Sequence, residues 1–417
     1  MWVRLGIVSA ASWLVGACYH PTAQVGLPCS ANHTCPGDQV CDLGQNPPTC
    51  VDELIDAGLD GPDTSTGGCR ADIECEGACH ELTGQCVAEA NVIYVSPTGA
   101  DNPTCTKTLP CATINTALQR VTATRALIRV ADGSYPDQWN LRRRGSINPT
   151  VIISGTDVDP AGAAFAPGNG AGDLQTDPDT ILVLEGVTIK GAEQNGLLVR
   201  GTATLSHVVI EGSGESGIDT RLGSTLIVLD SRIQGGQRVG ISSTQSLEVQ
   251  RSQVLNNLAG GITASGAFTI VNTVIANNGM QLNGTFGGAR LGAAAGKPAV
   301  FRFNTVTKNT GGSLASGVQC DTAVTIEDSI VHSNMGFLFP ELGAMCAPKY
   351  CLLATSPAFG NNVQGNPMFV NATSDFHVIA GSPAIDNADP AATETVDFEG
   401  GARPRGNARD IGADEQP

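Results

Sequence analysis

TATLSHVVIEGSGESGIDTRLGSTLIVLDSRIQGGQRVGISSTQSLEVQRSQVLNNLAGGITA, residues 202–264, contains three copies of one short pattern. In each copy a run rich in Val, Ile and Leu ends at a polar turn, and a second short run follows a glycine. The copies align on Ile210, Ile233 and Val254, which lie 23 and 21 residues apart. Recurrence at such a period is typical of a repeat protein built from stacked units.

The same pattern extends well beyond this stretch. The full set of anchor residues, at steps of 21, 23, 21, 21, 32 and 24 residues, is Ile189, Ile210, Ile233, Val254, Ile275, Thr307 and Val331. A second column with the same register contains Gly196, Gly217, Gly240, Gly261 and Gly317. Short strands with Gly and Asn turns at this period predict a parallel β-solenoid, whose coils stack about 4.8 Å apart with the anchors inward. The LxxLxLxxN pattern of leucine-rich repeats is absent.

Asparagines recur two or three positions after the anchors: Asn256, Asn257, Asn277, Asn278, Asn309 and Asn334. Asn tolerates left-handed backbone turns, and stacked side-chain amides can form hydrogen bonds from coil to coil. We therefore expect an asparagine ladder. Residues 112–122 have helical apolar spacing and are expected to cap the first coil, since an uncapped coil exposes a strand edge. Strands are expected at 128–130 and 150–154, and inserted loops at 157–179 and 280–298.

Two segments resemble known families. IYVSPTGAD, the P-x-x-TI-x-x-A helix start and VADGSY, within residues 91–135, resemble the N-terminal cap of right-handed parallel β-helix proteins of the pectate-lyase-like superfamily. Residues 365–415, including SPAIDNAD and GARPRGNARDIGADE, are similar to the C-terminal segment of bacterial surface β-helix proteins called choice-of-anchor Q. The resemblance implies an all-β, right-handed parallel β-helix over residues 91–364 and an associated segment over 365–417.

The first residues have the features of an export signal. Residues 1–17 contain one early Arg and an apolar run that is too short for a mature membrane anchor. The run ends in Val15-Gly16-Ala17-Cys18, which resembles a bacterial lipobox, so Cys18 is the expected lipidated N-terminus. The alternative is a secretory signal cut nearby, with Cys18 an ordinary thiol. We expect an exported protein of the bacterial cell envelope, an outer-membrane lipoprotein or surface protein that meets the membrane only through its lipid.

The cysteines support export, because disulfides persist in oxidising compartments. Residues 18–51 and 69–90 look like two copies of a four-cysteine unit, joined by an acidic linker over 52–68. Each unit is too small to fold by apolar burial alone, so two disulfides per unit are expected, with three pairings open in each. Zinc held with His80 is the rival reading. The cysteines expected in disulfides are Cys29, Cys35, Cys41, Cys50, Cys69, Cys75, Cys79, Cys86, Cys105 and Cys111. Cys320, Cys346 and Cys351 form an odd set.

Catalytic chemistry has few candidate residues. His207, Asp230 and Arg251 occupy one position on successive coils and would lie about 5 Å apart, as a base, a carboxylate and a cation on one stripe. The competing reading is a solvated face with ion pairs, which Asp219 with Arg200 and Arg221 also suggests. The resemblance implies a Lys or Arg base with acidic calcium ligands in lyases, or a GHG motif with several Asp in hydrolases, and the hydrolase motif is missing. GSGESG at 212–217 is read as a solenoid turn without nucleotide binding, because no helix follows.

Two binding features remain. Calcium is the one cofactor considered, and its candidate ligands are Asp397, Glu399, Asp410 and Asp414, although Asp397 and Asp410 could instead pair with nearby arginines. Tyr135 and Trp139 beside Arg142–Arg144 could contact an acidic sugar, or Tyr135 could be a core aromatic.

The net charge of −17 argues against nucleic-acid partners. We expect a non-catalytic β-helix for surface binding or display, with polysaccharide as the candidate partner. The alternative is a polysaccharide lyase or related carbohydrate-active enzyme.

Overall fold

A computed structural model describes residues 40–42, 49–51, 69, 71–136, 140–141, 150–156, 160–167, 174–279, 286–336, 340–355 and 359–416. The chain divides into two units, Met1–Leu59 and Asp60–Pro417. In the first unit the structure describes one antiparallel hairpin, of β1 (Val40–Asp42) and β2 (Thr49–Val51), in which Cys41 lies opposite Cys50. The expected signal peptide and Cys18, Cys29 and Cys35 lie outside the described residues.

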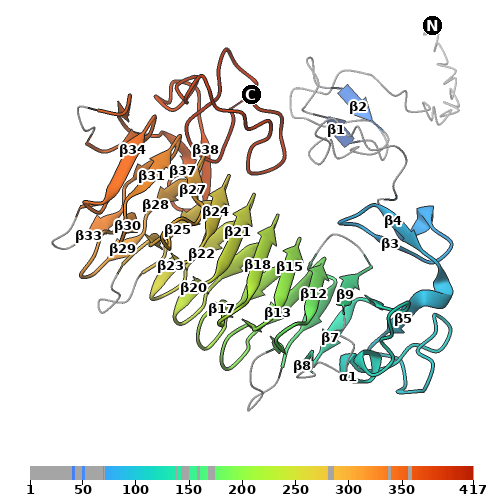
Figure 1. The fold of residues 1–417 in the computed structure, drawn as a ribbon. Helices are drawn as coiled ribbons and strands as arrows, with labels where there is room; N and C mark the ends of the chain where they lie inside the picture. Colours follow the sequence, from blue (N-terminus) through green and yellow to red (C-terminus); the bar gives the residue numbers. More distant parts are fainter. Residues whose placement is uncertain are drawn as a thin grey trace, which may run out of the picture. The chain divides into compact units, whose positions relative to one another are not determined.

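The second unit is a parallel β-helix, as the repeats predict, and its coils follow one another along one axis (Figure 1). The central coils contribute one strand to each of three parallel sheets, which are named here in the order in which the chain visits them; the coils at the two ends have no strand in sheet 3. Sheet 1 contains β5 (Val92–Val95), β6 (Leu127–Val130), β9 (Thr150–Gly155), β12 (Ile181–Glu185), β15 (Thr202–Ser206), β18 (Thr225–Leu229), β21 (Ser246–Gln250), β24 (Phe268–Val271), β27 (Ala299–Arg302), β31 (Val324–Glu327) and β34 (Cys346–Lys349). Sheet 2 contains β7 (Gly133–Tyr135), β10 (Ala163–Phe165), β13 (Val187–Lys190), β16 (Val209–Glu211), β19 (Arg232–Gln234), β22 (Gln253–Leu255), β25 (Val274–Ala276), β28 (Thr305–Thr307), β32 (Ile330–His332), β35 (Leu352–Leu353) and β36 (Val363–Gln364). Sheet 3 contains β8 (Asn140–Leu141), β11 (Leu174–Thr176), β14 (Leu197–Val199), β17 (Ile218–Thr220), β20 (Val239–Ser243), β23 (Gly260–Ala264), β26 (Ala289–Leu291) and β30 (Val318–Cys320).

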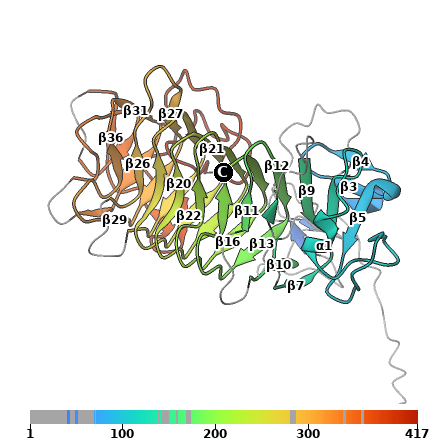
Figure 2. The ribbon, with the colours of Figure 1, turned by 60° about the horizontal axis from the view of Figure 1, so that its bottom comes forward.

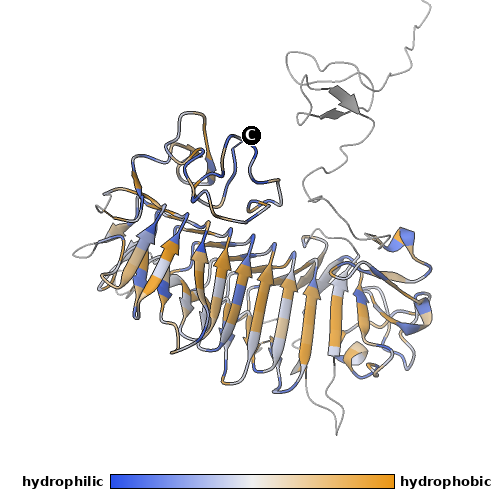
Figure 3. Cartoon of the chain, turned by 45° about the horizontal axis from the view of Figure 1, so that its top comes forward, coloured by the Kyte–Doolittle hydropathy of each residue, from blue (hydrophilic) through white to orange (hydrophobic). Residues whose placement is uncertain are grey.

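The core is the interior of these coils. Ile189, Ile210 and Ile233 lie side by side in sheet 2 and are fully buried. Their equivalents in the other sheets point into the same apolar column, so one continuous core runs through the coils. Hydrophobic stretches, in orange, occur in strand after strand along the β-helix, beside hydrophilic ones (Figure 3). A single coil could not bury this surface, and stacking therefore stabilises the fold.

Sharp turns join sheet 1 to sheet 2 through one residue with positive φ. The residues at this corner, with φ between 44° and 56°, are Gly186, His207, Asp230, Arg251, Asn272, Phe303, Asp328 and Tyr350. Few L-residues adopt this conformation readily, which explains the recurrence of Asn and Asp here. The corner bends the chain from sheet 1 into sheet 2 within one or two residues, and the side chain at this position points outward.

The predicted asparagine ladder is present inside the coils. Nδ2 of Asn257, Asn278 and Asn309 donates to Oδ1 of the next asparagine at 3.0, 3.0 and 2.9 Å. Asn334 ends the ladder by donating to Glu341 at 2.9 Å. The preceding residues Asn256 and Asn277 have φ of 56° and 58°, so both expected roles of asparagine are confirmed. The ladder satisfies buried backbone groups as well, because Asn257 N–H also donates to Asn278.

Three details of the predicted organisation are wrong. Ile275 pairs with Val306 rather than Thr307, so Thr307 is not an anchor and faces outward, and Phe303 occupies the corner position of this coil. The expected loop at 157–179 contains β10 and β11. The expected loop at 280–298 contains β26, preceded by Gly288, which continues the glycine column. These strands are only three residues long and contain small or polar residues, so their sequences resemble loops.

The first coil is capped as expected, by a helix shorter than predicted. Helix α1 (Ile114–Leu118) buries Ile114, Ala117 and Leu118 against the core, and the Thr113 hydroxyl accepts a hydrogen bond from Thr116 N–H at 3.1 Å. The loop before it is held by the Cys105–Cys111 disulfide and covers the edge of β5, since Cys111 N–H donates to Tyr94 C=O at 2.9 Å.

The second cysteine-rich unit packs on the outside of sheet 1. It contains the turns η1 (Asp72–Glu74) and η2 (Glu89–Asn91) and a hairpin of β3 (Ala78–His80) and β4 (Gln85–Val87), in which Cys79 lies opposite Cys86. Its disulfides are Cys69–Cys79 and Cys75–Cys86, which favours disulfides over the rival zinc reading. Ala78 packs against Val92 and Leu127. The unit therefore belongs to the body of the β-helix.

Two buried charges lie under this unit. Arg129 on β6 donates to Asp72, to Cys79 C=O and to Ser154, and only 2% of its side chain is exposed. Glu185 on β12 accepts from Leu82 N–H at 3.1 Å, and His80 Nε2 lies 3.3 Å from it. Both belong to one outward column of sheet 1, so the strands and the unit share one polar interface. Figure 2 shows β3 and β4 beside β5 and β9.

The C-terminal segment crosses the outside of the later coils and contains a hairpin of β37 (Phe369–Asn371) and β38 (Asp375–Val378). Phe376 and Phe398 pack on Val274 and Ala276 of β25, and Asn272 Nδ2 donates to Val396 C=O at 2.8 Å. Arg403 is buried and lies 4.4 Å from the Phe303 ring centroid. The short strands β29 (Thr310–Gly311) and β33 (Met335–Gly336) pair with each other. Among the described residues, no helix has the length and apolarity needed to cross a membrane.

Candidate functional site

The corner between sheets 1 and 2 holds the three catalytic candidates. His207, Asp230 and Arg251 share the positive-φ position on neighbouring coils, so the structure places them in one row as expected. Arg251 is committed to Asp230, because Nε lies 2.7 Å from Oδ1 and Nη2 lies 2.7 Å from Oδ2. This ion pair raises the pKa of Arg251 and keeps it charged. His207 Nδ1 lies 3.1 Å from the Ser206 hydroxyl. The row is therefore a coil-to-coil ion pair with a neighbouring histidine.

Other charges on the β-helix surface also form ion pairs, either within one coil or between neighbouring coils. Arg221 lies 2.9 Å from Asp219, and Arg290 lies 2.7 Å from Asp321 on the following coil. Tyr135 is buried in the core, where its hydroxyl donates to Ala131 C=O at 2.7 Å, which favours the core reading of this aromatic. Trp139 and Arg142–Arg144 lie outside the described residues. The GSGESG segment forms the turn between β16 and β17.

The four calcium candidates lie in the C-terminal segment, but the structure does not gather them around one point. Asp397 accepts from Glu399 N–H and Gly401 N–H, Asp410 from Asp386 N–H and Gln416 N–H, and Asp414 from Val378 N–H. Burial raises the pKa of Asp397, Asp410 and Asp414 against these hydrogen bonds. Of the groups that the structure describes, only the sulfurs of Cys69, Cys75 and Cys79 form a compact set of three ligands, and these are bonded in disulfides.

Other acidic residues of the C-terminal segment form ion pairs with Arg403 and His377. Arg403 Nε lies 3.2 Å from Glu415, and the guanidinium donates to Gly412, Ala413 and Asp414 C=O. Glu399 lies 3.1 Å from His377 Nε2, while Asp375 lies 2.5 Å from Nδ1. These carboxylates raise the pKa of His377 to about 9, and the histidine lowers the pKa of Glu399. The carboxylates of the C-terminal segment thus bind backbone N–H groups and basic side chains of the same segment.

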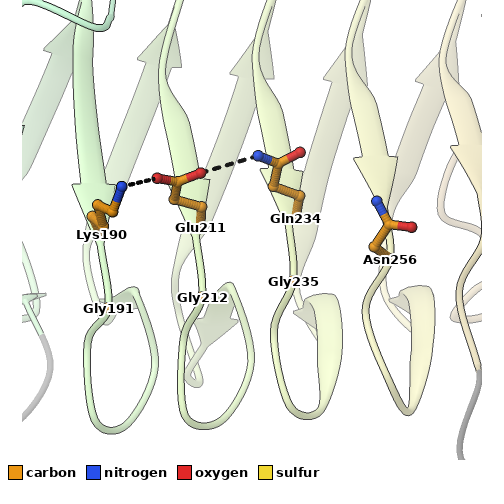
Figure 4. Close-up of a pocket in the computed structure, with 7 residues that line it drawn as sticks. All are labelled: Lys190, Gly191, Glu211, Gly212, Gln234, Gly235 and Asn256. Atoms are coloured by element: carbon orange, nitrogen blue, oxygen red, sulfur yellow. Dashed lines mark hydrogen bonds and ion pairs between the residues drawn. The ribbon is translucent and has the colours of Figure 1, made fainter. Parts of the chain in front are cut away.

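A surface groove that the sequence did not indicate lies on the outside of sheet 2 (Figure 4). Its volume is about 510 Å³, and it is a shallow, open trough. Lys190, Glu211 and Gln234 are neighbours on the last residues of β13, β16 and β19, and Asn256 follows β22. The side chains at these strand ends point outward because the preceding anchors point inward.

Hydrogen bonds connect the groove from coil to coil. Lys190 Nζ lies 2.9 Å from Glu211 Oε1, and Gln234 Nε2 donates to Glu211 Oε2 at 3.1 Å (Figure 4). The Lys190 contact lowers the pKa of Glu211, so the carboxylate stays ionised and its charge is balanced by one ammonium. The outward column was readable from the repeat, as the residue after each anchor, but its polar character alone did not distinguish it from any solvated face.

Comparison with known proteins identifies the class of fold. Residues 167–291 match the family model described as "Right handed beta helix region". The solved structure of pectate lyase Pel9A is similar, with a TM-score of 0.54 and 15% sequence identity, covering 79% of this chain and all of that protein. The body of this protein is therefore a right-handed parallel β-helix. At this identity the likeness concerns the fold alone. A comparison with curated protein sequences finds no match.

The structure also shows the state of the three cysteines near the C-terminal end of the β-helix. Cys320 and Cys346 form a disulfide between β30 and β34, which leaves Cys351 as the free member of the odd set. Cys351 is fully buried, and this burial raises its pKa to about 12. A thiol in this state is unreactive at neutral pH.

Proposed function

We propose that this protein is an exported lipoprotein of a bacterial cell envelope whose β-helix binds polysaccharide at the surface without cleaving it. The observation that carries the proposal is the way in which surface charges are paired from coil to coil. Asp230 with Arg251 and Asp321 with Arg290 neutralise each other across neighbouring coils. A general base or an acid catalyst needs a titratable group aimed at the substrate, and these groups are aimed at each other.

A second candidate is a polysaccharide lyase, favoured by the similarity in fold to pectate lyase Pel9A. The two candidates differ in one measurable respect. A lyase breaks the glycan chain and leaves an unsaturated product, whereas a binding protein returns the chain intact. The protein should be purified with its disulfides formed and incubated with acidic and neutral polysaccharides in the presence of Ca²⁺. Binding and chain length are measured together.

Binding without chain shortening is the expected result. Chain cleavage that is abolished by His207→Ala or Arg251→Ala would overturn the non-catalytic proposal in favour of the lyase. Cleavage unaffected by these substitutions would do so too, with the catalytic residues elsewhere. If no glycan binds, the polysaccharide part of the proposal fails.

The lipid anchor is tested separately. Residues 1–17 followed by Cys18 support lipidation at Cys18. Expression of the full chain in a bacterium that processes lipoproteins, with labelled palmitate, should label the wild type and not Cys18→Ser. Label in Cys18→Ser, or none in the wild type, would contradict the anchor.

A further inference from the structure

We propose that the groove on sheet 2 holds a stretch of neutral polysaccharide that lies along the axis of the β-helix. This inference rests on the proposed function and names both its binding site and its ligand class. The groove consists of Lys190, Glu211, Gln234 and Asn256 on four successive coils, with Gly191, Gly212 and Gly235 beside them.

The spacing of the groove fits an extended glycan. Each coil presents one polar side chain, and successive coils are about 4.8 Å apart. A pyranose ring in an extended chain advances by a similar distance, so one ring can meet one coil. An extended peptide fits less well, because its residues advance by about 3.3 Å and it usually binds to a free strand edge. The four strands β13, β16, β19 and β22 are paired on both sides and offer no such edge.

The chemistry of the groove favours hydroxyl groups over carboxylates. The amide side chains of Gln234 and Asn256 supply both donors and acceptors, as a sugar hydroxyl requires. Among the residues that line the groove, Lys190 is the one cation, and it is paired with Glu211; Arg232 on β19 also acts on Glu211 but donates to Gln253 at 3.1 Å. The whole chain has a net charge of −17, which repels polyuronates and other acidic glycans. A neutral polysaccharide is therefore the class that fits.

The backbone leaves room for a ligand beside these side chains. Gly191, Gly212 and Gly235 have φ of 65°, 68° and 69°. A Cβ built on Gly191 has no heavy atom within 4 Å, and one built on Gly212 has its nearest neighbour at 3.9 Å. A Cβ built on Gly235 lies 3.5 Å from Gly212 N, an ordinary contact distance, so a sugar ring could contact the backbone beside Gly191 and Gly212.

One end of the groove is bounded by the C-terminal segment. In the column that contains Lys190, Glu211 and Gln234, the next residues are Leu255 and Ala276. These two pack under Phe376 and Phe398, and Asn277 Nδ2 donates to Thr373 C=O at 3.1 Å. The groove thus ends where the C-terminal segment covers sheet 2, and this segment would limit how far a bound glycan chain extends.

The test fills the groove without changing the fold. Gly212→Asn places a side chain in the groove at a positive-φ position, and the equivalent residues Asn256 and Asn277 show that asparagine fits there. The matched control is Gly223→Asn, because Gly223 also has positive φ, of 85°, with no atom within 4 Å of an added Cβ, and it lies outside the groove. A second groove variant, Gln234→Ala, removes an amide.

The full chain, its lipid-free form and the variants are tested against a soluble β-glucan, a mannan and a galactan, with polygalacturonate as the acidic comparison. We expect a neutral glycan to bind, Gly212→Asn and Gln234→Ala to weaken its binding at least tenfold, and Gly223→Asn to match the wild type. Thermal unfolding verifies that each variant is folded.

Two results would overturn the inference and leave the proposed function intact. The first is wild-type binding of a neutral glycan that Gly212→Asn and Gln234→Ala leave unchanged, which would place the site elsewhere. The second is binding of polygalacturonate alone. If the wild type binds no glycan, both the inference and the polysaccharide part of the proposed function fail.

Discussion

Arg251 forms a two-point ion pair with Asp230 on the preceding coil, with both N–O distances at 2.7 Å. The two residues are 21 positions apart in the chain, and the corner turn brings them together because it recurs at the same place in each coil. The pair is partly exposed, with 25% and 22% of the side chains accessible. It accounts for the carboxylate and the cation of this column, which bind each other from coil to coil.

Arg251→Met should therefore act on stability and leave glycan binding unchanged. The loss of a two-point but solvent-screened pair is expected to lower the free energy of unfolding by about 1 kcal/mol. Arg221→Met is the matched control, since Arg221 is 57% exposed beside Asp219, and it should cost less. Urea unfolding of both variants provides the comparison. A larger loss for Arg221→Met would contradict this account of the corner column.

The asparagine ladder should be far more sensitive. Asn278 is fully buried, donates to Asn309 at 3.0 Å and to Val254 C=O at 2.9 Å, and accepts from Asn257. Asn278→Ala leaves these partners unsatisfied inside the coil, and each such group costs about 1–3 kcal/mol. We expect the free energy of unfolding to fall by about 3 kcal/mol or more.

Asn256→Gly is the control for the ladder, because Asn256 has the positive-φ turn role and its equivalents in earlier coils are glycines. Urea unfolding should show a change of less than about 1 kcal/mol. If both variants lose the same free energy of unfolding, the hydrogen bonds of the ladder do not explain why asparagine recurs at the ladder position.

Arg129 and its hydrogen-bond partners form a clamp between sheet 1 and the second cysteine-rich unit. This clamp gives a local prediction. Arg129→Met removes the donors to Asp72 and Cys79 C=O in the unit and to Ser154 in sheet 1. A buried charge whose partners lie on both sides of an interface holds that interface in one place, and its removal leaves those partners unpaired. We expect hydrogen exchange of residues 71–90 to accelerate at least tenfold, while the sheet 2 strands β16 and β19 keep wild-type protection.

Arg125→Met is a suitable comparison for the clamp, since Arg125 donates to Val92 and Cys105 C=O within the first coils and makes none of the contacts to the unit that Arg129 makes. If its exchange pattern in 71–90 equals that of Arg129→Met, the clamp does not hold the unit. Loss of protection throughout the β-helix in Arg129→Met would mean that the unit stabilises the whole fold and not only its own attachment.

The sequence predicted those parts of the fold that repeat. Ile210, Gly217 and Asn257 recur at fixed offsets, and each offset corresponds to one position in a coil, so the coil length and the ladder followed from the spacing. The prediction failed where a coil has an irregular length. The pairing of Ile275 with Val306 lies across a step of 31 residues, and a shift of one position moved the predicted anchor to Thr307.

Contacts between distant segments could not be predicted from one sequence. Arg129 and Glu185 lie in one outward column, but the polar hairpin that covers them carries no signal for where it packs. The groove on sheet 2 could not be predicted from the sequence either. Lys190, Glu211 and Gln234 look like solvated residues in the sequence, and only their position beside open glycines and the C-terminal segment separates them from the rest of the surface.

Acid should strengthen the contact between the C-terminal segment and the β-helix. Asp328 is buried at the corner, accepts from Asp389 N–H at 2.6 Å, and faces Glu327, Asp389 and Glu394. Burial, joined by these negative charges, raises its pKa from 3.8 to about 6. Since the folded pKa is above the unfolded one, the folded protein loses stability as pH rises from about 4 to 6, by about 3 kcal/mol at most.

Asp328→Asn should remove the part of this pH dependence that comes from Asp328. Asparagine keeps an oxygen for Asp389 N–H and tolerates the φ of 47°, so only the charge is lost. At pH 7 the variant should be more stable than the wild type, and at pH 4 the two should be alike. Unfolding measured by urea at pH 4, 5, 6 and 7 tests this. A variant less stable than the wild type at pH 7 would show that the Asp328 charge is favourable in the fold.

Alkaline solutions should weaken the same segment through His377. Glu399 and Asp375 lie 3.1 and 2.5 Å from its two ring nitrogens and raise its pKa from 6.5 to about 9. The folded pKa exceeds the unfolded one, so the stabilisation is complete below pH 6.5 and is lost as pH rises to about 9. The side chain is 36% exposed, and solvent screening therefore limits the effect to about 1 kcal/mol. His377→Gln should show a flatter dependence of unfolding free energy on pH between 6.5 and 9.5, with a smaller gap to the wild type at pH 9.5 than at pH 6.5. A gap that grows with pH would mean that neutral His377 stabilises the segment more than the charged form does.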